Sequence, residues 1–236
     1  MIPSSEEERR IAKLRARAEA ELEPILWQNI MEWADTCKGL TALLLQFVRA
    51  RPEKEEGIEV AFTLVNRTAR WRVMHNVRTV FDKQYDKELH REMKRRLVNS
   101  FFYQNTTGGL PVYYNNMAQG DLKHEDLIPS RAILNDLSVM WIQEMEYREQ
   151  IIFPKCCADH NTLVNQMIVV FDAGGAGIAT LKLLKYLPVT LGLNAEYYPE
   201  SVKSILVTNA PALINMLMAA VNPFLPEATK KKIRIT

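Results

Sequence analysis

The chain has 236 residues, 47% of them hydrophobic and 25% charged, which is an ordinary composition for a globular protein with a sizeable core. Its formal net charge of +2 argues against a nucleic-acid partner, because nucleic-acid-binding domains usually carry a strongly basic, clustered surface. Three cysteines, an odd and low number, argue against a secreted disulfide scaffold and favour a reducing compartment.

The first ten residues are charged rather than apolar, so they do not have the form of a signal peptide. No stretch reaches the roughly 18 consecutive apolar residues of a membrane span. The longest apolar stretch, residues 210–225, is interrupted by Asn215, Asn222 and Pro223. We therefore expect a soluble, cytoplasmic protein that contacts membranes, if at all, only at their surface.

Helical spacing of apolar residues recurs through the first 80 residues. The segments with this spacing are residues 5–34, 40–51 and 57–78. Pro24 is expected to break the first segment, and the last carries an arginine-rich polar face. Together they predict a helical bundle over residues 1–80.

From residue 81 to the end, strand-like and helix-like segments alternate. The predicted strands are residues 100–103, 110–114, 167–172, 204–208 and 233–235. The predicted helices are residues 82–99, 127–153, 178–187 and 211–221. The alternation over residues 100–236 predicts an α/β layer with parallel strands.

A glycine-rich turn, residues 173–177, follows the apolar strand at residues 167–172. Its position between a strand and a helix resembles the dinucleotide-binding fingerprint, but Thr180 stands where the third glycine is required. The acidic residue expected at the end of the next strand is also missing, because that strand ends in Asn209. A tight strand-to-helix turn is favoured over a nucleotide site.

Cys156, Cys157 and His160 are residue types that bind metals. A structural zinc site needs four ligands, usually in spaced pairs, and the sequence has no second cluster. Buried thiols that pack as small apolar groups are therefore favoured over a metal site. No Ser–His–Asp or Cys–His arrangement is convincing either, so no enzyme activity, metal or cofactor is expected.

The basic stretches and the most apolar helix each allow two interpretations. The basic stretches at residues 94–96 and 230–234 fit solvated helix ends, or contacts to anionic lipid. Residues 211–221 are apolar nearly all round, so this helix must be buried or must face something apolar that is not protein. A core helix and the wall or gate of a lipid cavity are both consistent with its composition.

Four stretches of the second half carry a resemblance to a known family. They are residues 167–174, 197–200, 207–211 and 222–225, the last leading into residues 229–233. They resemble the CRAL-TRIO lipid-binding family and, within it, the phosphatidylinositol/phosphatidylcholine transfer proteins. Further family-like motifs are residues 44–51, Trp71-Arg72 and residues 110–113. The order and spacing of these motifs match over residues 40–236.

The resemblance implies a fold and a function. The fold is a helical N-terminal lobe, residues 1–80, packed on a lipid-binding lobe, residues 81–236, with a mixed, largely parallel sheet flanked by helices around an apolar pocket. The implied function is to bind a phospholipid, favouring phosphatidylinositol, and to transfer or present it between membranes. The alternatives are a carrier of another hydrophobic ligand, such as a sterol or retinoid, and a lipid-sensing regulatory adaptor.

The resemblance also implies contacts to the lipid headgroup. The family's phosphatidylinositol-contacting positions match Arg51, Glu200, Thr229 and Lys232. Arg51 and Lys232 offer charge-assisted hydrogen bonds to a phosphate. Glu200 offers an acceptor for inositol hydroxyls, or orients a cation.

The family's phosphatidylcholine-contacting positions match less well. They fall on Phe102, Tyr113, Met167 and Val169. Met167 and Val169 replace a serine and a threonine of the family and cannot bind a phosphate, so we expect weak or absent phosphatidylcholine binding, or a different hydrophobic second ligand. The resemblance further implies a mobile gate, whose apolar residues are Ile214, Met216, Leu217, Met218, Val221 and Phe224.

Partners, location and completeness follow from the resemblance as well. We expect a monomer that visits membrane surfaces transiently, at the Golgi or endosomes, with a lipid kinase or small GTPase as a protein partner. Family members continue past the strand that matches residues 233–235, so this chain is expected to lack the C-terminal elements that brace the gate.

Overall fold

The computed structural model describes residues 3–37, 39–50, 56–82, 99–116, 131–174, 176, 187–212, 214–225 and 227–236. The chain divides into two compact units, each assembled from three separate stretches of sequence. The first unit comprises Met1–Asp82, Glu144–Gln166 and Asn194–Ser201, and the second comprises Lys83–Gln143, Met167–Leu193 and Val202–Thr236. The expected division into a helical bundle over residues 1–80 and a lipid-binding domain over residues 81–236 stays a prediction.

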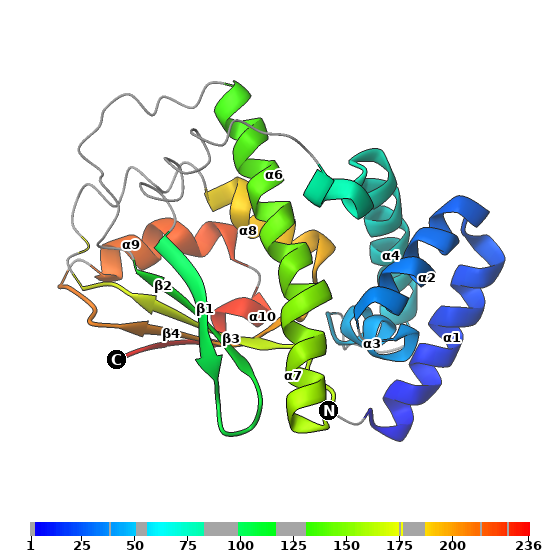
Figure 1. Cartoon of the computed structure of the whole chain (residues 1–236), viewed down its shortest axis with the longest axis horizontal. Helices are drawn as coiled ribbons and strands as arrows, with labels where there is room; N and C mark the ends of the chain where they lie inside the picture. The colour runs from blue at the N-terminus through cyan, green and yellow to red at the C-terminus, as the bar shows by residue number, and fades with distance from the viewer. Residues whose placement is uncertain are drawn as a thin grey trace. The chain divides into compact units, whose positions relative to one another are not determined.

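Helices make up the N-terminal stretch of the first unit. In the described residues they are α1 (Ser5–Glu21), α2 (Pro24–Cys37), α3 (Leu40–Ala50), α4 (Glu56–Met74) and the 3-10 helix η1 (Val77–Asp82). The expected break at Pro24 is the start of α2, where the missing N–H of proline costs nothing. Figure 1 shows these helices, blue to cyan, lying against one another.

The apolar helix α3 supplies much of the core of this bundle. Every residue from Ala42 to Val48 is buried, and Leu43, Leu44 and Phe47 are fully so. A helix that is apolar on most of its circumference is stable only where neighbours cover it. The buried stripe Ile11, Leu14 and Ala18 of α1 is the amphipathic face expected from the sequence.

The long helix expected at residues 127–153 is observed as three consecutive pieces. They are α6 (Arg131–Tyr147), the π-helical turn η2 (Arg148–Ile152) and α7 (Phe153–His160). Residues 127–130 lie outside the described part of the chain. The helices expected at residues 82–99 and 178–187 also fall almost entirely on positions that the structure does not describe.

The second unit contains a five-stranded sheet in the order β1-β2-β3-β4-β5. Its strands are β1 (Asn99–Asn105), β2 (Pro111–Asn116), β3 (Met167–Asp172), β4 (Val202–Thr208) and β5 (Ile233–Ile235). β1 and β2 form an antiparallel hairpin, and all other neighbours are parallel. The expected mixed, largely parallel sheet is confirmed.

Pairing register aligns one row of side chains across the whole sheet. The row consists of Phe102, Tyr113, Val169, Ile205 and Ile233. Paired residues in neighbouring strands point to the same face, so this row marks an apolar face of the sheet. Figure 1 shows helix α9 (Ile214–Val221) lying beside the sheet.

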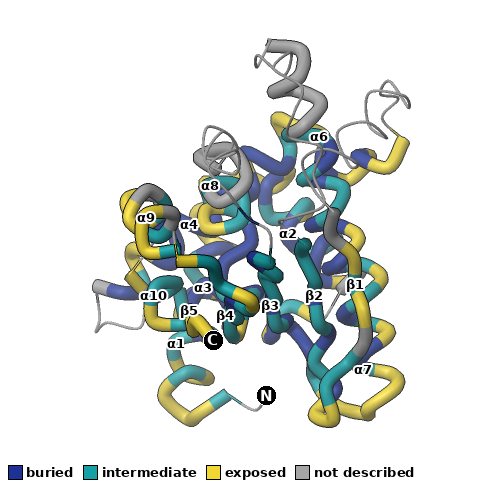
Figure 2. The backbone as a smooth tube through the Cα atoms, turned by 90° about the vertical axis from the view of Figure 1, so that its left-hand side faces the viewer, coloured by how far each residue is buried: buried dark blue, intermediate teal, exposed yellow. Residues whose placement is uncertain are grey.

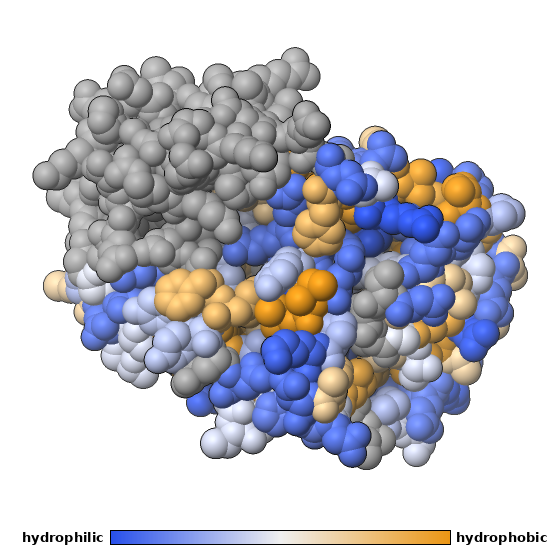
Figure 3. Space-filling model, in the orientation of Figure 1, coloured by the Kyte–Doolittle hydropathy of each residue, from blue (hydrophilic) through white to orange (hydrophobic). Residues whose placement is uncertain are grey.

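The remaining described helices are α8 (Leu187–Tyr197), η4 (Asn222–Phe224) and α10 (Glu227–Lys230). Among the described residues, no helix combines the length and the apolar character that crossing a bilayer requires. The face of the molecule in Figure 3 shows hydrophobic groups in separate patches between hydrophilic ones.

Candidate functional site

The residues predicted to contact a second ligand lie together on one face of the sheet. Phe102 and Tyr113 are paired, with ring centroids 5.1 Å apart. Tyr113 is paired in turn with Val169. Met167 precedes Val169 by two residues on β3 and therefore shares its face. Tyr113, Met167 and Val169 are buried, so the structure forms an apolar surface from these four positions.

Helix α9 carries the predicted gate. Ile214 packs against a small apolar cluster of Ala173, Ala176 and Val207, which anchors the start of the helix. Met216 is 50% exposed, whereas Met218 and Val221 are half-buried. The side chains of Leu217 and Phe224 lie outside the described part of the structure. Exposed positions recur along α9, yellow in Figure 2, so this apolar helix presents hydrophobic surface to water.

Two predicted headgroup residues, Thr229 and Lys232, lie at the end of α10 and in the turn that follows. The Lys232 N–H donates to the Thr229 carbonyl at 3.0 Å and closes the turn. The Lys232 ammonium donates to the Val202 carbonyl at 2.9 Å, at the start of β4. The structure brings these two residues together, whereas Arg51 lies outside the described residues.

Glu200, in the first unit, has a left-handed backbone with φ of +55°. In the described part of the chain, the other non-glycine residues with positive φ are Asn76, Asn161 and Asn209. Asparagine tolerates this region, whereas other L-residues incur a cost of about 1–2 kcal/mol. The surroundings of Glu200 must therefore impose this conformation.

A buried ionic network in the first unit includes Tyr198, which precedes Glu200 by two residues. Arg72 donates to both oxygens of Glu146, at 2.7 and 3.2 Å, and the two side chains are 3% and 0% exposed. The Tyr198 hydroxyl donates to the same carboxylate at 2.6 Å. Burial, and then the Glu146 charge, raise the pKa of Tyr198 well above its ordinary value. Tyr198 therefore remains a proton donor to Glu146.

A second buried ion pair occupies the π-helical turn. Arg148 and Glu149 are each 1% exposed, and their charged groups are 3.0 Å apart. Arg148 also donates to Asn194 Oδ1 at 3.3 Å. The guanidinium lies 5.5 Å from the ring centre of Tyr198. The two ion pairs thus converge on the segment that contains Tyr198.

Hydrogen bonds also hold the backbone on both sides of Glu200. The Gln166 amide donates to the Glu200 carbonyl at 3.0 Å. The Ser201 hydroxyl donates to the Tyr198 carbonyl at 3.0 Å. Both Gln166 and Ser201 are buried. These bonds fix the turn in which Glu200 takes its left-handed conformation.

Aromatic contacts complete the same region. Trp71 stacks face to face on Tyr197, with centroids 4.0 Å apart and planes 4° from parallel. The Arg72 guanidinium lies 4.1 Å from the ring centre of Trp33. The family-like Trp71-Arg72 motif and residues 197–200 therefore meet in this structure, through stacking and through the shared Glu146.

Sequence reasoning did not single out Glu146, Arg148, Glu149 or Gln166. The three charged residues fall in a predicted helix, where charged side chains are usually solvated, and Gln166 falls outside every predicted helix and strand. A signal was present, because Ile142, Met145, Glu146 and Glu149 fall on one helical stripe at positions i, i+3, i+4 and i+7. Charged residues on an otherwise apolar stripe indicate buried partners.

The glycine-rich turn after β3 is organised by Asp172. Its carboxylate accepts hydrogen bonds from Tyr114 (2.5 Å), Asn209 (2.8 Å) and the Gly174 N–H (3.0 Å). These bonds, led by that of Tyr114, lower the pKa of Asp172. A Cβ at Gly174 would lie 3.1 Å from Asp172 Oδ1, closer than most Cβ contacts, so a larger residue there would push the Asp172 carboxylate aside. This geometry supports a structural turn; Gly175 and Gly177 lie outside the described residues.

The cysteine cluster has a local structural role. Cys156 is buried, and Cys157 Sγ accepts a hydrogen bond from the Val164 N–H at 3.1 Å. Among the described residues, no three metal-binding side chains come together.

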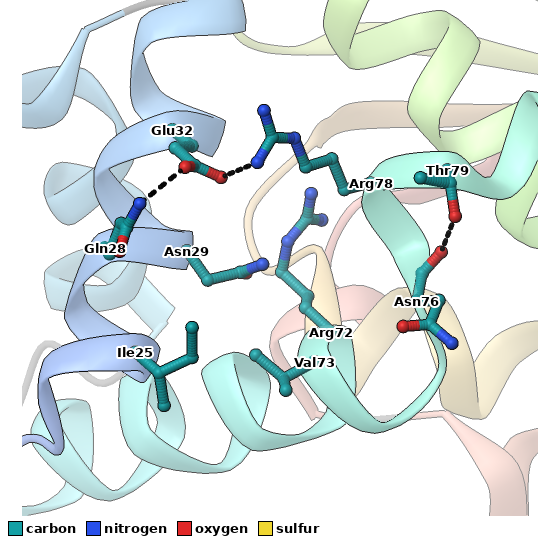
Figure 4. A pocket seen from close by; sticks show the side chains of 9 residues that line it. All are labelled: Ile25, Gln28, Asn29, Glu32, Arg72, Val73, Asn76, Arg78 and Thr79. Carbon is teal, nitrogen blue, oxygen red and sulfur yellow. Dashed lines mark hydrogen bonds and ion pairs between the residues drawn. The ribbon is translucent and has the colours of Figure 1, made fainter.

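A pocket of about 230 Å³ lies in the first unit among α2, the end of α4 and η1 (Figure 4). It is lined by Ile25, Gln28, Asn29, Glu32, Arg72, Val73, Asn76, Arg78 and Thr79. Glu32 accepts hydrogen bonds from Gln28 at 3.0 Å and from Arg78 at 2.7 Å. The charges of Glu32 and Arg78 therefore neutralise each other. Arg72, from the family-like Trp71-Arg72 motif, lines this pocket, but none of the predicted ligand-contacting or gate residues does.

The mixed, largely parallel sheet with one apolar face, and the apolar helix α9 packed beside it through Ile214, define an α/β protein. The chain belongs to the CRAL/TRIO domain family, whose family model matches residues 96–236. The expected family membership and fold class are thereby confirmed.

The chain is similar to several proteins over most of its length. It is 26% identical over 198 residues to the Sec14 cytosolic factor of Schizosaccharomyces pombe, covering 82% of this chain and 65% of that protein. It is 23% identical over 196 residues to the phosphatidylinositol/phosphatidylcholine transfer protein SFH7 of Arabidopsis thaliana, covering 82% of this chain and 34% of that protein. The chain thus spans less than two thirds of the length of these relatives.

A solved structure shares the fold. The crystal structure of Sfh5 superimposes with a TM-score of 0.69 at 17% identity, covering 100% of this chain and 81% of that chain. At this identity the likeness establishes the fold alone.

Proposed function

We propose that this chain binds a phospholipid, favours phosphatidylinositol over phosphatidylcholine, and transfers or presents it between membranes. The observation that carries this proposal is the apolar face of the sheet formed by Phe102, Tyr113, Met167 and Val169. Helix α9, which exposes Met216, packs through Ile214 on a cluster next to this face. Relatives named for cytosolic and lipid-transfer roles support the proposal.

The headgroup assignment follows from the chemistry of the matched residues. Lys232 offers an ammonium to the lipid phosphate, with Thr229 beside it in the same turn. Glu200 offers a carboxylate that accepts from inositol hydroxyls. A choline headgroup has no hydroxyl, so it gains nothing from this carboxylate as a hydrogen-bond acceptor.

Phosphatidylcholine is disfavoured by the apolar residues on β3. Met167 and Val169 are buried and have no hydrogen-bond donor for a phosphate. A charged group placed there without a donor carries an unfavourable desolvation cost. The acyl chains meet no such cost, because each buried CH₂ contributes about 0.8 kcal/mol in the protein or in the membrane. Exchange is therefore close to balanced, and opening of the gate limits its rate.

The first experiment identifies the lipid. The purified protein is extracted and its lipid quantified by mass spectrometry, and transfer of labelled phosphatidylinositol and phosphatidylcholine is measured between vesicles. We expect about one phosphatidylinositol per chain. Lys232→Ala should lose this lipid, whereas Lys231→Ala, which removes an exposed neighbouring lysine, should keep it. Equal lipid in both variants overturns the headgroup assignment.

A gain-of-function variant tests the second part of the proposal. Met167→Ser combined with Val169→Thr restores the family's polar residues on β3, and should raise phosphatidylcholine binding without loss of phosphatidylinositol. A sterol or retinoid in the extract would instead favour the alternative hydrophobic carrier. Stoichiometric lipid without transfer would favour a regulatory adaptor that recruits a lipid kinase or small GTPase.

We further propose that the protein acts as a monomer in the cytoplasm, at the surface of Golgi or endosomal membranes. The name of the fission yeast relative, a cytosolic factor, supports the cytoplasmic part. Imaging of a tagged protein, together with its sedimentation at several concentrations, tests both statements.

A further inference from the structure

Glu200 combines a proposed ligand contact with an unfavourable backbone conformation. We propose that the buried network of the first unit is a positioning device that holds Glu200 in its left-handed conformation and so determines headgroup selectivity. Gln166 is its key positioning residue. The inference rests on the proposed function, because it assigns selectivity to the geometry of a residue that contacts the headgroup.

The backbone conformation of Glu200 is unusual for its residue type. Glu200 has φ of +55°, in a region where the other described non-glycine residues are all asparagine. A glutamate in this region persists only where the surrounding structure over-determines it, and such residues cluster at ligand sites. A glycine or asparagine here would satisfy the turn. The choice of glutamate therefore indicates a requirement for its side chain.

Several hydrogen bonds hold the backbone around Glu200. Gln166 donates to the Glu200 carbonyl at 3.0 Å, and Ser201 donates to the Tyr198 carbonyl at 3.0 Å. Tyr198 is itself tied to Glu146 at 2.6 Å. Each of these partners is buried, so water does not replace a lost bond easily. The turn at Glu200 is thus fixed from both sides.

The network is built from buried ion pairs. Arg72, Glu146, Arg148 and Glu149 are each at most 3% exposed and form two ion pairs. Buried ion pairs often stabilise a fold no better than apolar residues of the same volume, whereas their directional bonds can specify one geometry. Both pairs lead to the segment Asn194–Ser201, through Tyr198 and Asn194. What they specify is therefore the backbone next to Glu200.

The test compares two buried glutamines in the 236-residue chain. Gln166→Leu removes the bond to the Glu200 carbonyl. Gln46→Leu is the matched control, because Gln46 is 3% exposed and donates at 3.1 Å to the Asn165 carbonyl instead. Each protein is incubated with vesicles that contain equal phosphatidylinositol and phosphatidylcholine, well below its melting temperature, and the ratio of the two bound lipids is measured by mass spectrometry.

Gln166→Leu should lower the bound ratio of phosphatidylinositol to phosphatidylcholine about fivefold. This is the change expected when the loss of one hydrogen bond weakens the contact of Glu200 with the headgroup. Gln46→Leu should change this ratio less than about twofold, although both variants lose similar stability. In a Glu200→Gln background, Gln166→Leu should have no further effect on the ratio. Ser201→Ala serves as the second variant if Gln166→Leu does not fold.

The outcomes separate this inference from the proposed function. A wild-type protein without bound phospholipid overturns both. A wild-type protein with phospholipid whose ratio is unchanged by Glu200→Gln, or by Gln166→Leu and Ser201→Ala, overturns the positioning role while phospholipid binding stands. An equal loss of selectivity in Gln46→Leu also overturns it, because the effect then reflects general destabilisation.

Discussion

Removing the negative charge of Glu146 should destabilise the protein strongly. Arg72 donates to both Glu146 oxygens, at 2.7 and 3.2 Å, and both side chains are almost completely buried. Glu146→Gln keeps the shape but leaves the guanidinium without a counter-charge in the interior. Breaking a buried ion pair in this way costs about 3–5 kcal/mol, a large part of the roughly 5–15 kcal/mol that stabilises a typical protein.

A double variant separates the cost of an unpaired charge from the value of the pair. Arg72→Met together with Glu146→Met removes both charges and keeps apolar volume. Because no charge is then left unpaired, the double variant should lose at least about 3 kcal/mol less than the sum of the two single variants. Some loss should remain, because the Tyr198 hydroxyl and the Gln150 amide both donate to Glu146.

Urea denaturation followed by tryptophan fluorescence measures these differences as shifts of the midpoint at constant slope. A loss below about 1 kcal/mol for Glu146→Gln, or additive losses in the double variant, would refute the reasoning. Either result would mean that water or relaxed side chains solvate Arg72 when its partner is gone.

Three further predictions concern local geometry. Hydrogen bonds from Arg49 hold the pKa of Glu7 at about 2, below its ordinary value of 4.5. The ionised Glu7 carboxylate therefore stabilises the fold fully above pH 4.5, and this stabilisation is lost as the pH falls to about 2. Glu7→Gln should therefore cost about 1 kcal/mol in neutral solution and little at pH 2, and a pH-independent difference in chemical denaturation would contradict this. Gly174→Ala should lower stability by about 1 kcal/mol, because the added Cβ lies 3.1 Å from Asp172 Oδ1; an unchanged melting temperature would count against the tight turn. Glu200→Gly should be more stable than Glu200→Ala by about 1 kcal/mol, the reverse of their order in a helix, and the opposite order in urea melts would show that the turn is not strained.

The strands and most described helices could be predicted from the sequence because their signals are local. The apolar run at residues 167–172 is a parallel strand, and Pro24 is the start of a helix. The motifs shared with the family also located Arg72 and Tyr198. The motifs do not explain why an arginine and a tyrosine stand at these positions. The structure does, because both side chains bind Glu146, which lies 74 positions from Arg72.

The buried charges and the exposure of helix α9 were harder to predict because burial depends on partners distant in sequence. Arg148 and Glu149 are adjacent in the chain, and a regular helix would not be expected to pair them in its interior, but the π-helical turn does. The composition of α9 predicted apolar surroundings, whereas Met216 is half exposed to water. The left-handed backbone of Glu200 has no signal in the residue type, since glutamate rarely adopts it.

The assembly of the first unit from Met1–Asp82, Glu144–Gln166 and Asn194–Ser201 has a consequence for synthesis on the ribosome. The helices α1–α4 leave the ribosome first, but the last stretch of their unit is made about 120 residues later, a delay on the order of ten seconds at usual translation rates. During this delay Arg72 lacks the counter-charge of Glu146 until that residue has been made, and Trp71 lacks the stacked ring of Tyr197 until that residue has been made. The nascent chain therefore displays an arginine and a tryptophan that the finished protein hides, a surface suited to chaperones that bind unfinished proteins.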